Sequence, residues 1–159
     1  MRHQWVTKEE FIDALCVMLD AHRRLGFSEP IPFPTEEQFD RSASVVVSIN
    51  QPVYGQDRYP ALTEKVSAAF YELIKQHIFF NGNKRIATYF LLHLLAMNGY
   101  MLDVDEPEDL AEFAKRVATS DARDRARELE HINKKVQADL VATEAWNLFR
   151  RRRGLFWQA

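Results

Sequence analysis

A chain of 159 residues is long enough for one domain with a full hydrophobic core and too short for two comfortable ones. Hydrophobic residues make up 47% and charged residues 28%, and the formal net charge of -2 argues against general nucleic-acid binding. The single cysteine, Cys16, excludes an intramolecular disulfide and fits a reducing compartment such as the cytoplasm. The longest apolar run, Ile86–Met97, is too short to span a membrane.

Two helices are predicted in the N-terminal third. Thr7–Glu10 has the pattern of a capping box and opens a helix that ends at Gly26. The three prolines of Pro30–Pro34 keep the next segment extended. Thr35–Gln38 is a second capping box and opens a helix that ends at about Ile49.

The middle of the chain predicts a loop and two packed helices. Asn50–Pro60 contains prolines and a glycine and is predicted as a loop, with a possible short β-hairpin. Pro60–His77 carries apolar residues along one helical face. Lys84–Met97 is apolar nearly all round, which is typical of a buried central helix.

Shorter elements are predicted in the C-terminal third. Met101–Val104 is expected to be extended, and Pro107 opens a helix that ends near Ser120. Asp121–Val136 is highly charged, with a thin apolar stripe. A last amphipathic helix is expected over Leu140–Phe149.

These elements predict an all-α fold, a single bundle of about seven helices. We expect residues 1–120 to form the core domain and residues 121–159 to form a helical extension packed on it or next to it. Four consecutive arginines, Arg150–Arg153, fit either a solvated helix end or contact with an acidic partner or nucleic acid, and the first interpretation is favoured.

The stretch from His77 to Arg85 places a histidine, a glycine and two cations directly before the central helix. Backbone N–H groups and the dipole at a helix N-terminus favour an anion, and Gly82 lets the backbone approach it. Asn83 adds a backbone donor, and Lys84 and Arg85 add charge, with arginine able to bind a phosphate through two nitrogens. His77 is placed to act as a general base. The sequence therefore predicts a nucleotide-phosphate site with its own base.

Each of these residues also has a plainer interpretation. A histidine at a helix end is often an ordinary polar residue, and Lys84 and Arg85 could be exposed cations in a first helical turn. Cations there oppose the helix dipole, however, so they favour an anion as neighbour. Asn83 can cap the helix with or without a phosphate. Phe79 is expected in the core, and Phe80 either in the core or in the wall of the nucleotide pocket.

The sequence HIFFNGNKR at residues 77–85 resembles the signature loop of the Fic/Doc family, His-x-Phe-x-Asp/Glu-Gly-Asn-Gly/Lys-Arg. Tyr59–Lys65 and Asn98–Tyr100 resemble the family's flanking segments, and the similarity covers about residues 6–119. Lys84, where AMP-transferring members usually have Gly, is similar to the Doc branch. The resemblance implies an all-helical fold and transfer of part of a nucleoside triphosphate onto a protein hydroxyl.

Two positions depart from the family pattern. Asn81 stands where the family has Asp or Glu, a carboxylate that the resemblance implies holds Mg²⁺. A neutral amide lacks the charge that a hard cation favours, so metal binding is expected to be weak. Thr88 stands where AMP-transferring relatives commonly have a second Arg. The family's self-inhibiting Ser/Thr-x-x-x-Glu helix has no convincing copy here, so a separate antitoxin is expected to restrain the protein.

The loop Gln51–Tyr59 matches the place where the family carries a flap that binds the target peptide by strand addition. Val53, Tyr54 and Tyr59 would be the contacts. A plain surface loop is an equally good interpretation of the sequence itself.

The sequence leaves three functional hypotheses open. The first is a Doc-like toxin that transfers a phosphoryl group from ATP to a Ser/Thr hydroxyl of a host protein, for which the resemblance implies elongation factor Tu. The second is AMP transfer to a protein hydroxyl. In both, His77, Lys84 and Arg85 are the catalytic residues. The third is a non-catalytic module that binds nucleotide or a partner, because Asn81 has lost the metal.

Overall fold

The computed structural model describes residues 3–144, apart from the side chain of Pro107. This part of the chain forms six α-helices, one 3₁₀ turn and one small antiparallel sheet. In chain order the elements are α1 (Lys8–Arg24), α2 (Glu36–Ile49), α3 (Leu62–Lys75), α4 (Asn83–Met97), β1 (Tyr100–Leu102), α5 (Pro107–Thr119), η1 (Ala122–Asp124), α6 (Arg125–Asp139) and β2 (Leu140–Ala142). The predicted helical bundle is confirmed, with six α-helices and a 3₁₀ turn for the expected seven or so helices.

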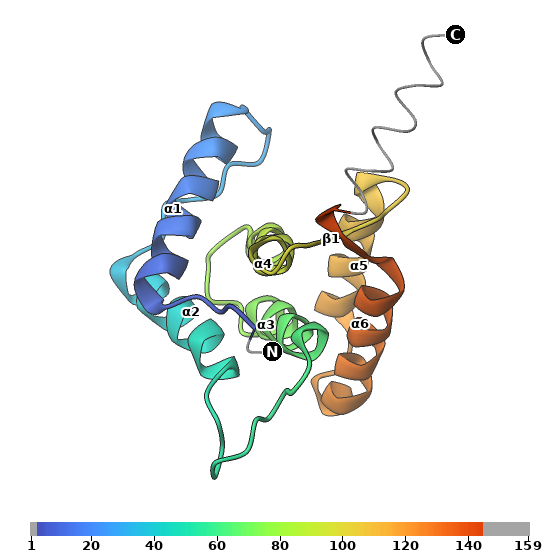
Figure 1. Ribbon diagram of the computed structural model, residues 1–159. Helices are drawn as coiled ribbons and strands as arrows, with labels where there is room; N and C mark the ends of the chain where they lie inside the picture. Colours follow the sequence, from blue (N-terminus) through green and yellow to red (C-terminus); the bar gives the residue numbers. More distant parts are fainter. Residues whose placement is uncertain (1–2, 145–159) are drawn as a thin grey trace, which may run out of the picture.

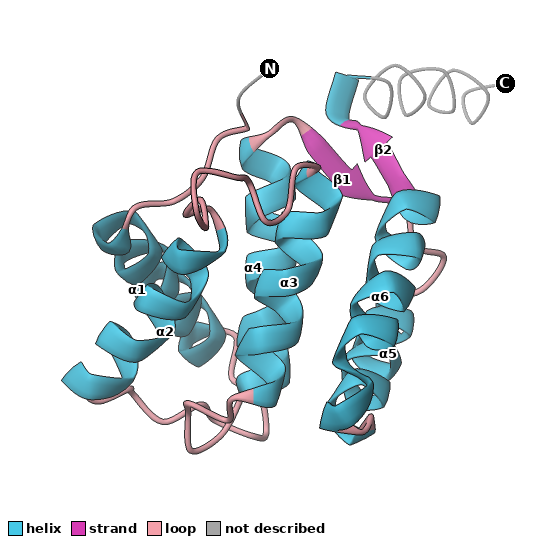
Figure 2. Ribbon diagram, turned by 90° about the horizontal axis from the view of Figure 1, so that it is seen from below, coloured by secondary structure: helices cyan, strands magenta, loops and turns pink. Residues whose placement is uncertain are grey.

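Helices α3 and α4 form the middle of the bundle. In Figure 1 α4 is seen end-on, with α1 and α2 on one side and α5 and α6 on the other. The view from below in Figure 2 shows the same three pairs side by side, with the sheet at one end. Helix α3 contacts α2, α4, α5 and α6, so it joins the two outer pairs.

The core is built from aromatic and branched side chains around α4. Phe90 is fully buried and stacks on Phe11 of α1 with 4.1 Å between ring centroids. Phe70 of α3 stacks on Phe113 of α5 at 5.6 Å. Burial of one such side chain contributes about 1.5–3 kcal/mol. Helix α4 is therefore the central helix, as predicted, although Leu92 on its outer side stays 38% exposed.

Both predicted capping boxes are confirmed. The Thr7 hydroxyl accepts from the N–H of Glu10 at 3.2 Å, and the Glu10 carboxylate accepts from the N–H of Thr7 at 2.8 Å. Thr35 and Gln38 form the same pair of hydrogen bonds at 3.2 and 3.0 Å. Each box satisfies two backbone donors that the helix itself cannot pair, which fixes where α1 and α2 begin.

The expected last helix does not begin at Leu140. Leu140 pairs with Leu102, and Ala142 pairs with Tyr100, so this segment is the second strand of an antiparallel sheet. The β-branched Val141 between them suits a strand better than a helix. The expected extended segment at Met101 is confirmed as β1. Of the predicted last helix, Thr143 and Glu144 are helical, and residues 145–149 lie outside the described residues.

Helix α6 shares the core of the bundle. It packs on α3, and its residues Ile132 and Val136 are buried. Arg125 at its start binds the Glu72 carboxylate through Nε and Nη2, at 3.1 and 2.7 Å. The segment 121–139 thus packs directly on residues 1–120, whereas Arg150–Arg153 lies outside the described residues.

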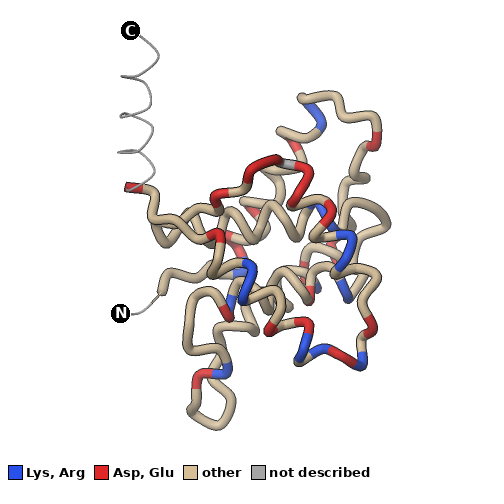
Figure 3. Tube along the Cα trace, turned by 90° about the vertical axis from the view of Figure 1, so that its right-hand side faces the viewer, with Lys and Arg blue, Asp and Glu red and all other residues tan. Residues whose placement is uncertain are grey.

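Across residues 3–144, each helix is either too short or too polar to cross a membrane. On the side of the molecule seen in Figure 3, basic and acidic residues are interspersed rather than gathered by sign.

Candidate active site

The predicted base lies just beyond α3 rather than inside it. The helix ends at Lys75, and the N–H of Gln76 makes the last helical hydrogen bond, to the Glu72 carbonyl at 3.0 Å. His77 follows with a φ of +44° and an exposed side chain. The expectation that the helix runs through His77 is wrong, because the chain must turn there to reach α4. A left-handed backbone costs a non-glycine residue about 1–2 kcal/mol. Because the His77 side chain is exposed, its own packing does not offset that cost.

Asn83 fastens the loop between α3 and α4. Its Oδ1 accepts from the N–H of Phe79 at 3.0 Å, and its Nδ2 donates to the Phe79 carbonyl at 2.7 Å. The Phe79 side chain is buried, as predicted, and anchors the loop in the core. Phe80 is 82% exposed, so the core interpretation of this residue is wrong.

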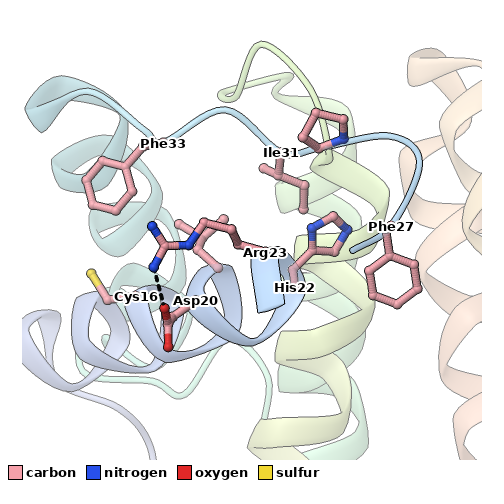
Figure 4. A pocket seen from close by; sticks show the side chains of 9 residues that line it. Cys16, Asp20, His22, Arg23, Phe27, Ile31 and Phe33 are labelled. Atoms are coloured by element: carbon pink, nitrogen blue, oxygen red, sulfur yellow. Dashed lines mark hydrogen bonds and ion pairs between the residues drawn. The ribbon is translucent and has the colours of Figure 1, made fainter. Parts of the chain in front are cut away.

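Gly82 turns the chain into α4 with a φ of +84°. A Cβ at this position would lie 2.7 Å from Cγ1 of Ile31, whose side chain reaches down from the loop between α1 and α2 (Figure 4). The N–H of Gly82 donates to Oδ1 of Asn81 at 2.7 Å. The first helical hydrogen bond of α4 is made by the N–H of Ile86, to the Gly82 carbonyl.

The first turn of α4 therefore has backbone donors to offer. Within the described residues no side chain caps this helix, and the N–H groups of Asn83, Lys84 and Arg85 have no protein acceptor. Uncapped N–H groups at a helix N-terminus suit an anion. The N–H of Gly82 is not among these unpaired donors, because Oδ1 of Asn81 already accepts its hydrogen bond.

We expect Gly82→Ala to lower the free energy of unfolding by about 2–3 kcal/mol, since a strained φ and a clash act together. Gly99→Ala is the matched control, because Gly99 has a φ of +80° and no atom within 4 Å of its would-be Cβ. It should lose only about 1 kcal/mol. Chemical denaturation measures both. Adding Ile31→Ala to Gly82→Ala should restore part of the lost stability, because it removes the clash. Equal losses in Gly82→Ala and Gly99→Ala would show that the clash with Ile31 does not contribute to the loss.

The two predicted cations have different surroundings. Lys84 is exposed and makes no ion pair within residues 3–144. Arg85 is half-buried, and its Nη1 lies 2.8 Å from Nε2 of His22 and donates to the carbonyl of Glu29. Lys84 can therefore turn toward an anion at the start of α4. Arg85 is instead held by His22, near the end of α1.

The residues near Asn81 do not fit a resident metal ion. Its Oδ1 is the acceptor for Gly82, and its Nδ2 lies 3.5 Å from the Pro30 carbonyl. Among the described residues no group of three or more histidine, cysteine or acidic side chains could hold a metal. One neutral oxygen is too weak a ligand set for Mg²⁺, which prefers carboxylates and phosphates.

The loop between α2 and α3 forms a tight turn. Val53 and Gln56 exchange both backbone hydrogen bonds, at 2.9 and 3.0 Å, which is a hairpin reduced to one residue pair. Tyr54 is fully exposed with a φ of +51°. Tyr59 is half-buried, and its hydroxyl accepts from Arg125 of α6 at 3.1 Å. Of the three predicted target contacts, Val53 and Tyr54 are therefore exposed, whereas Tyr59 packs toward the bundle.

A buried lysine holds this loop to α3. The Lys65 side chain is 6% exposed and donates to Oδ1 of Asn50 and, at 3.0 Å, to Oδ2 of Asp57. The hydrogen bond from Lys65 lowers the pKa of Asp57. The pair therefore stabilises the loop above the ordinary pKa of a carboxyl group, and this contribution is lost as the pH falls through the lowered value.

Lys65→Met is expected to speed proteolytic cutting within residues 50–60, because Asn50 and Asp57 both lose the buried donor that holds them to α3. Lys75→Met is the control from the same helix, since Lys75 instead donates to the Ala118 carbonyl at 3.2 Å. Limited proteolysis with mass spectrometry identifies the cut sites. Equal cutting of the two variants inside the loop would show that Lys65 does not hold it.

An apolar cavity of about 860 Å³ lies between α1, α4 and α5 and reaches the first turn of α4. Leu25, Leu92 and Leu110 are among its apolar lining residues, and Lys84 and Arg85 stand at its edge. The sequence gives no sign of this cavity, because its walls come from three separate helices.

Sequence reasoning also missed the segment Glu29–Ile31. Its three residues contact the loop at residues 77–85 one by one: the Glu29 carbonyl accepts from Arg85, the Pro30 carbonyl lies near Asn81, and Ile31 packs on Gly82. The three prolines predicted an extended segment there, but they gave no sign of what it crosses.

These features define a small helical protein with uncapped N–H groups and two cations at the start of its central helix and an exposed histidine in the loop before it. The model of the Fic/DOC family matches residues 9–95, more than half of the chain. A protein named Toxin Doc, from Mycolicibacterium smegmatis (strain ATCC 700084 / mc(2)155), is 41% identical over 73 residues, which are 43% of this chain and 54% of that protein. The chain thus spans about half the length of that relative. The chain belongs to the Fic/Doc family.

Proposed function

We propose that this protein is a Doc-like toxin that transfers a phosphoryl group from ATP to a Ser or Thr hydroxyl of another protein. The observation that carries the proposal is the exposed His77, in a strained backbone conformation six residues before the uncapped first turn of α4. The likeness to Toxin Doc supports the toxin assignment.

In the reaction, the target hydroxyl oxygen forms a bond to the γ-phosphorus of ATP as the bond to the β–γ bridging oxygen breaks and ADP leaves. His77 takes the proton of the hydroxyl. The N–H groups of the first turn of α4, with the charges of Lys84 and Arg85, bind the phosphate oxygens and stabilise the charge of the transition state. No step uses a metal held by this chain; Mg²⁺ would arrive with the phosphates of ATP.

AMP transfer is the second candidate product, and Thr88 argues against it. The Thr88 hydroxyl donates to the Lys84 carbonyl at 2.9 Å, so it brings neither positive charge nor a free donor to the place of the second Arg. Lys84 itself supports the Doc-like product, as the resemblance implies.

The partners of the protein follow from the toxin proposal. The target is a cytoplasmic protein of the host, with elongation factor Tu as the first candidate by resemblance, and a separate antitoxin restrains the activity. The apolar cavity between α1, α4 and α5 supports an antitoxin site, because a helix seated there would also cover Lys84 and Arg85 at its edge.

The third candidate, a non-catalytic module, rests on Asn81 and its poor ligand set. Such a module would bind nucleotide at the start of α4 without transferring any part of it.

Label transfer from ATP into a bacterial lysate tests all three. The expected result is a labelled protein band from γ-labelled ATP, with none from α-labelled ATP. A band from α-labelled ATP would move the protein to the AMP-transferring class. Nucleotide binding without any label would favour the non-catalytic module.

A further inference from the structure

His22 at the end of α1 lies against the phosphate-loop arginine. Its Nε2 is 2.8 Å from Nη1 of Arg85, a residue 63 positions later in the chain. The residue His22 is only 9% exposed, and its ring stacks on Phe27 at 4.6 Å between centroids, with an interplanar angle of 25°. Figure 4 shows the ring rising from α1 between Phe27 and Ile31. A buried ring in this position is held firmly by its neighbours.

The contact fixes the protonation of the ring. A guanidinium group has donors only and does not lose its proton in proteins. Nη1 of Arg85 must therefore donate, and Nε2 of His22 must accept. The ring is neutral, and its proton is on Nδ1.

Nη1 of Arg85 also donates to the carbonyl of Glu29, so both hydrogen bonds to the guanidinium use the same nitrogen. The edge formed by Nε and Nη2 is left unpaired within the described residues. The same edge of Arg125 clasps the Glu72 carboxylate at 3.1 and 2.7 Å, and that of Arg123 clasps Asp121 at 3.0 and 2.7 Å. Arg116 holds Glu128 through Nη1 and Nη2 instead, at 3.3 and 2.7 Å. In Arg85 Nη1 is already engaged, so Nε and Nη2 are the pair left to bind an oxyanion.

We propose that His22 is a positioning residue that holds Arg85 by Nη1, so that its Nε–Nη2 edge binds the phosphate of the nucleotide. The inference rests on the proposed function, since it assigns a geometry to the same phosphate site. His22 touches no substrate; it acts through Arg85.

Protonation of His22 would undo this arrangement, because a second donor and a second positive charge would face Arg85. Burial, and after it the charge of Arg85, lower the pKa of His22 below its ordinary value. Besides Arg85, the charged residues that line the two cavities next to His22 are Asp20 and Arg23 of α1, Glu29 of the loop, Lys84 of α4 and Lys115 of α5. Because the pKa is lowered, the neutral ring persists at neutral pH, and its loss begins only below the ordinary histidine value of about 6.5.

The test measures ATP binding by calorimetry for the wild type, His22→Gln and His22→Leu, at pH 7.5 and 5.5. Gln keeps an acceptor oxygen that does not titrate, whereas Leu removes it. At pH 7.5 we expect His22→Leu to bind ATP about tenfold more weakly and His22→Gln to stay within about threefold of the wild type. Between pH 7.5 and 5.5 the wild type should lose more affinity than His22→Gln, because only the wild type has a titrating ring beside Arg85 at position 22.

A second readout is independent of nucleotide. The pKa of His22, followed by NMR of the ring, should rise in Arg85→Gln because a neighbouring positive charge is removed. An unchanged His22 pKa, or a folded His22→Leu that binds ATP as tightly as the wild type, would overturn the positioning role. A wild type that does not bind ATP, with the His22 pKa still coupled to Arg85, would instead overturn the proposed function and with it the phosphate contact.

Discussion

His77→Ala and His77→Asn are both expected to lower label transfer by at least about 100-fold, the usual contribution of a positioned general base. Neither replacement can accept the hydroxyl proton at neutral pH. The two should differ in stability, because asparagine tolerates the left-handed backbone of His77, with its φ of +44°, better than alanine does. We expect His77→Ala to be about 1 kcal/mol less stable than His77→Asn. Label transfer and chemical denaturation measure the two effects separately.

An exposed histidine elsewhere provides the control. His131 is on α6, and His131→Asn should leave label transfer unchanged. If His77→Ala retained full transfer, the general-base mechanism would be ruled out. If His77→Asn lost both transfer and folding, the residue would be structural rather than catalytic.

The parts of the fold that sequence could predict are those set by neighbouring residues. The capping boxes at Thr7 and Thr35 need only four consecutive residues, and both formed as expected. The buried helix α4 follows from an apolar run that has no polar face to turn outward. The loop at residues 77–85 could be matched to the Fic/Doc signature because its glycine, cations and histidine all lie within nine residues.

The parts that sequence could not predict depend on contacts between distant residues. The local pattern at Leu140 predicts the start of an amphipathic helix, whereas in the structure Leu140 pairs with Leu102 in the sheet. From the sequence, His22 is one of several residues on the inner face of α1. It can accept a hydrogen bond from Arg85 only because α1 packs beside α4 in the folded protein. Helix propensity is weak enough for such tertiary contacts to override it.

Asn81 stands where the family has a carboxylate, and its amide oxygen is already used as the acceptor for the N–H of Gly82. Asn81→Asp is expected to raise Mg²⁺-dependent transfer roughly 10–100-fold, the scale on which changes at a metal site act. One carboxylate oxygen can still accept from the N–H of Gly82, now 2.7 Å from Oδ1. The other oxygen, with its charge, then becomes available to a Mg²⁺ ion that arrives with the phosphates of ATP.

Asn81→Ala is the matched control, because it removes the acceptor for Gly82 and adds no charge. It should lower transfer, and excess chelator should abolish the gain of Asn81→Asp but have a smaller effect on the wild type. Equal transfer by Asn81→Asp and the wild type would mean that an amide oxygen is sufficient here and that the phosphates alone hold the metal. Transfer seen only in Asn81→Asp would identify the natural protein as a nucleotide-binding module that lacks one carboxylate, because its Lys84, Arg85 and His77 would then be shown competent.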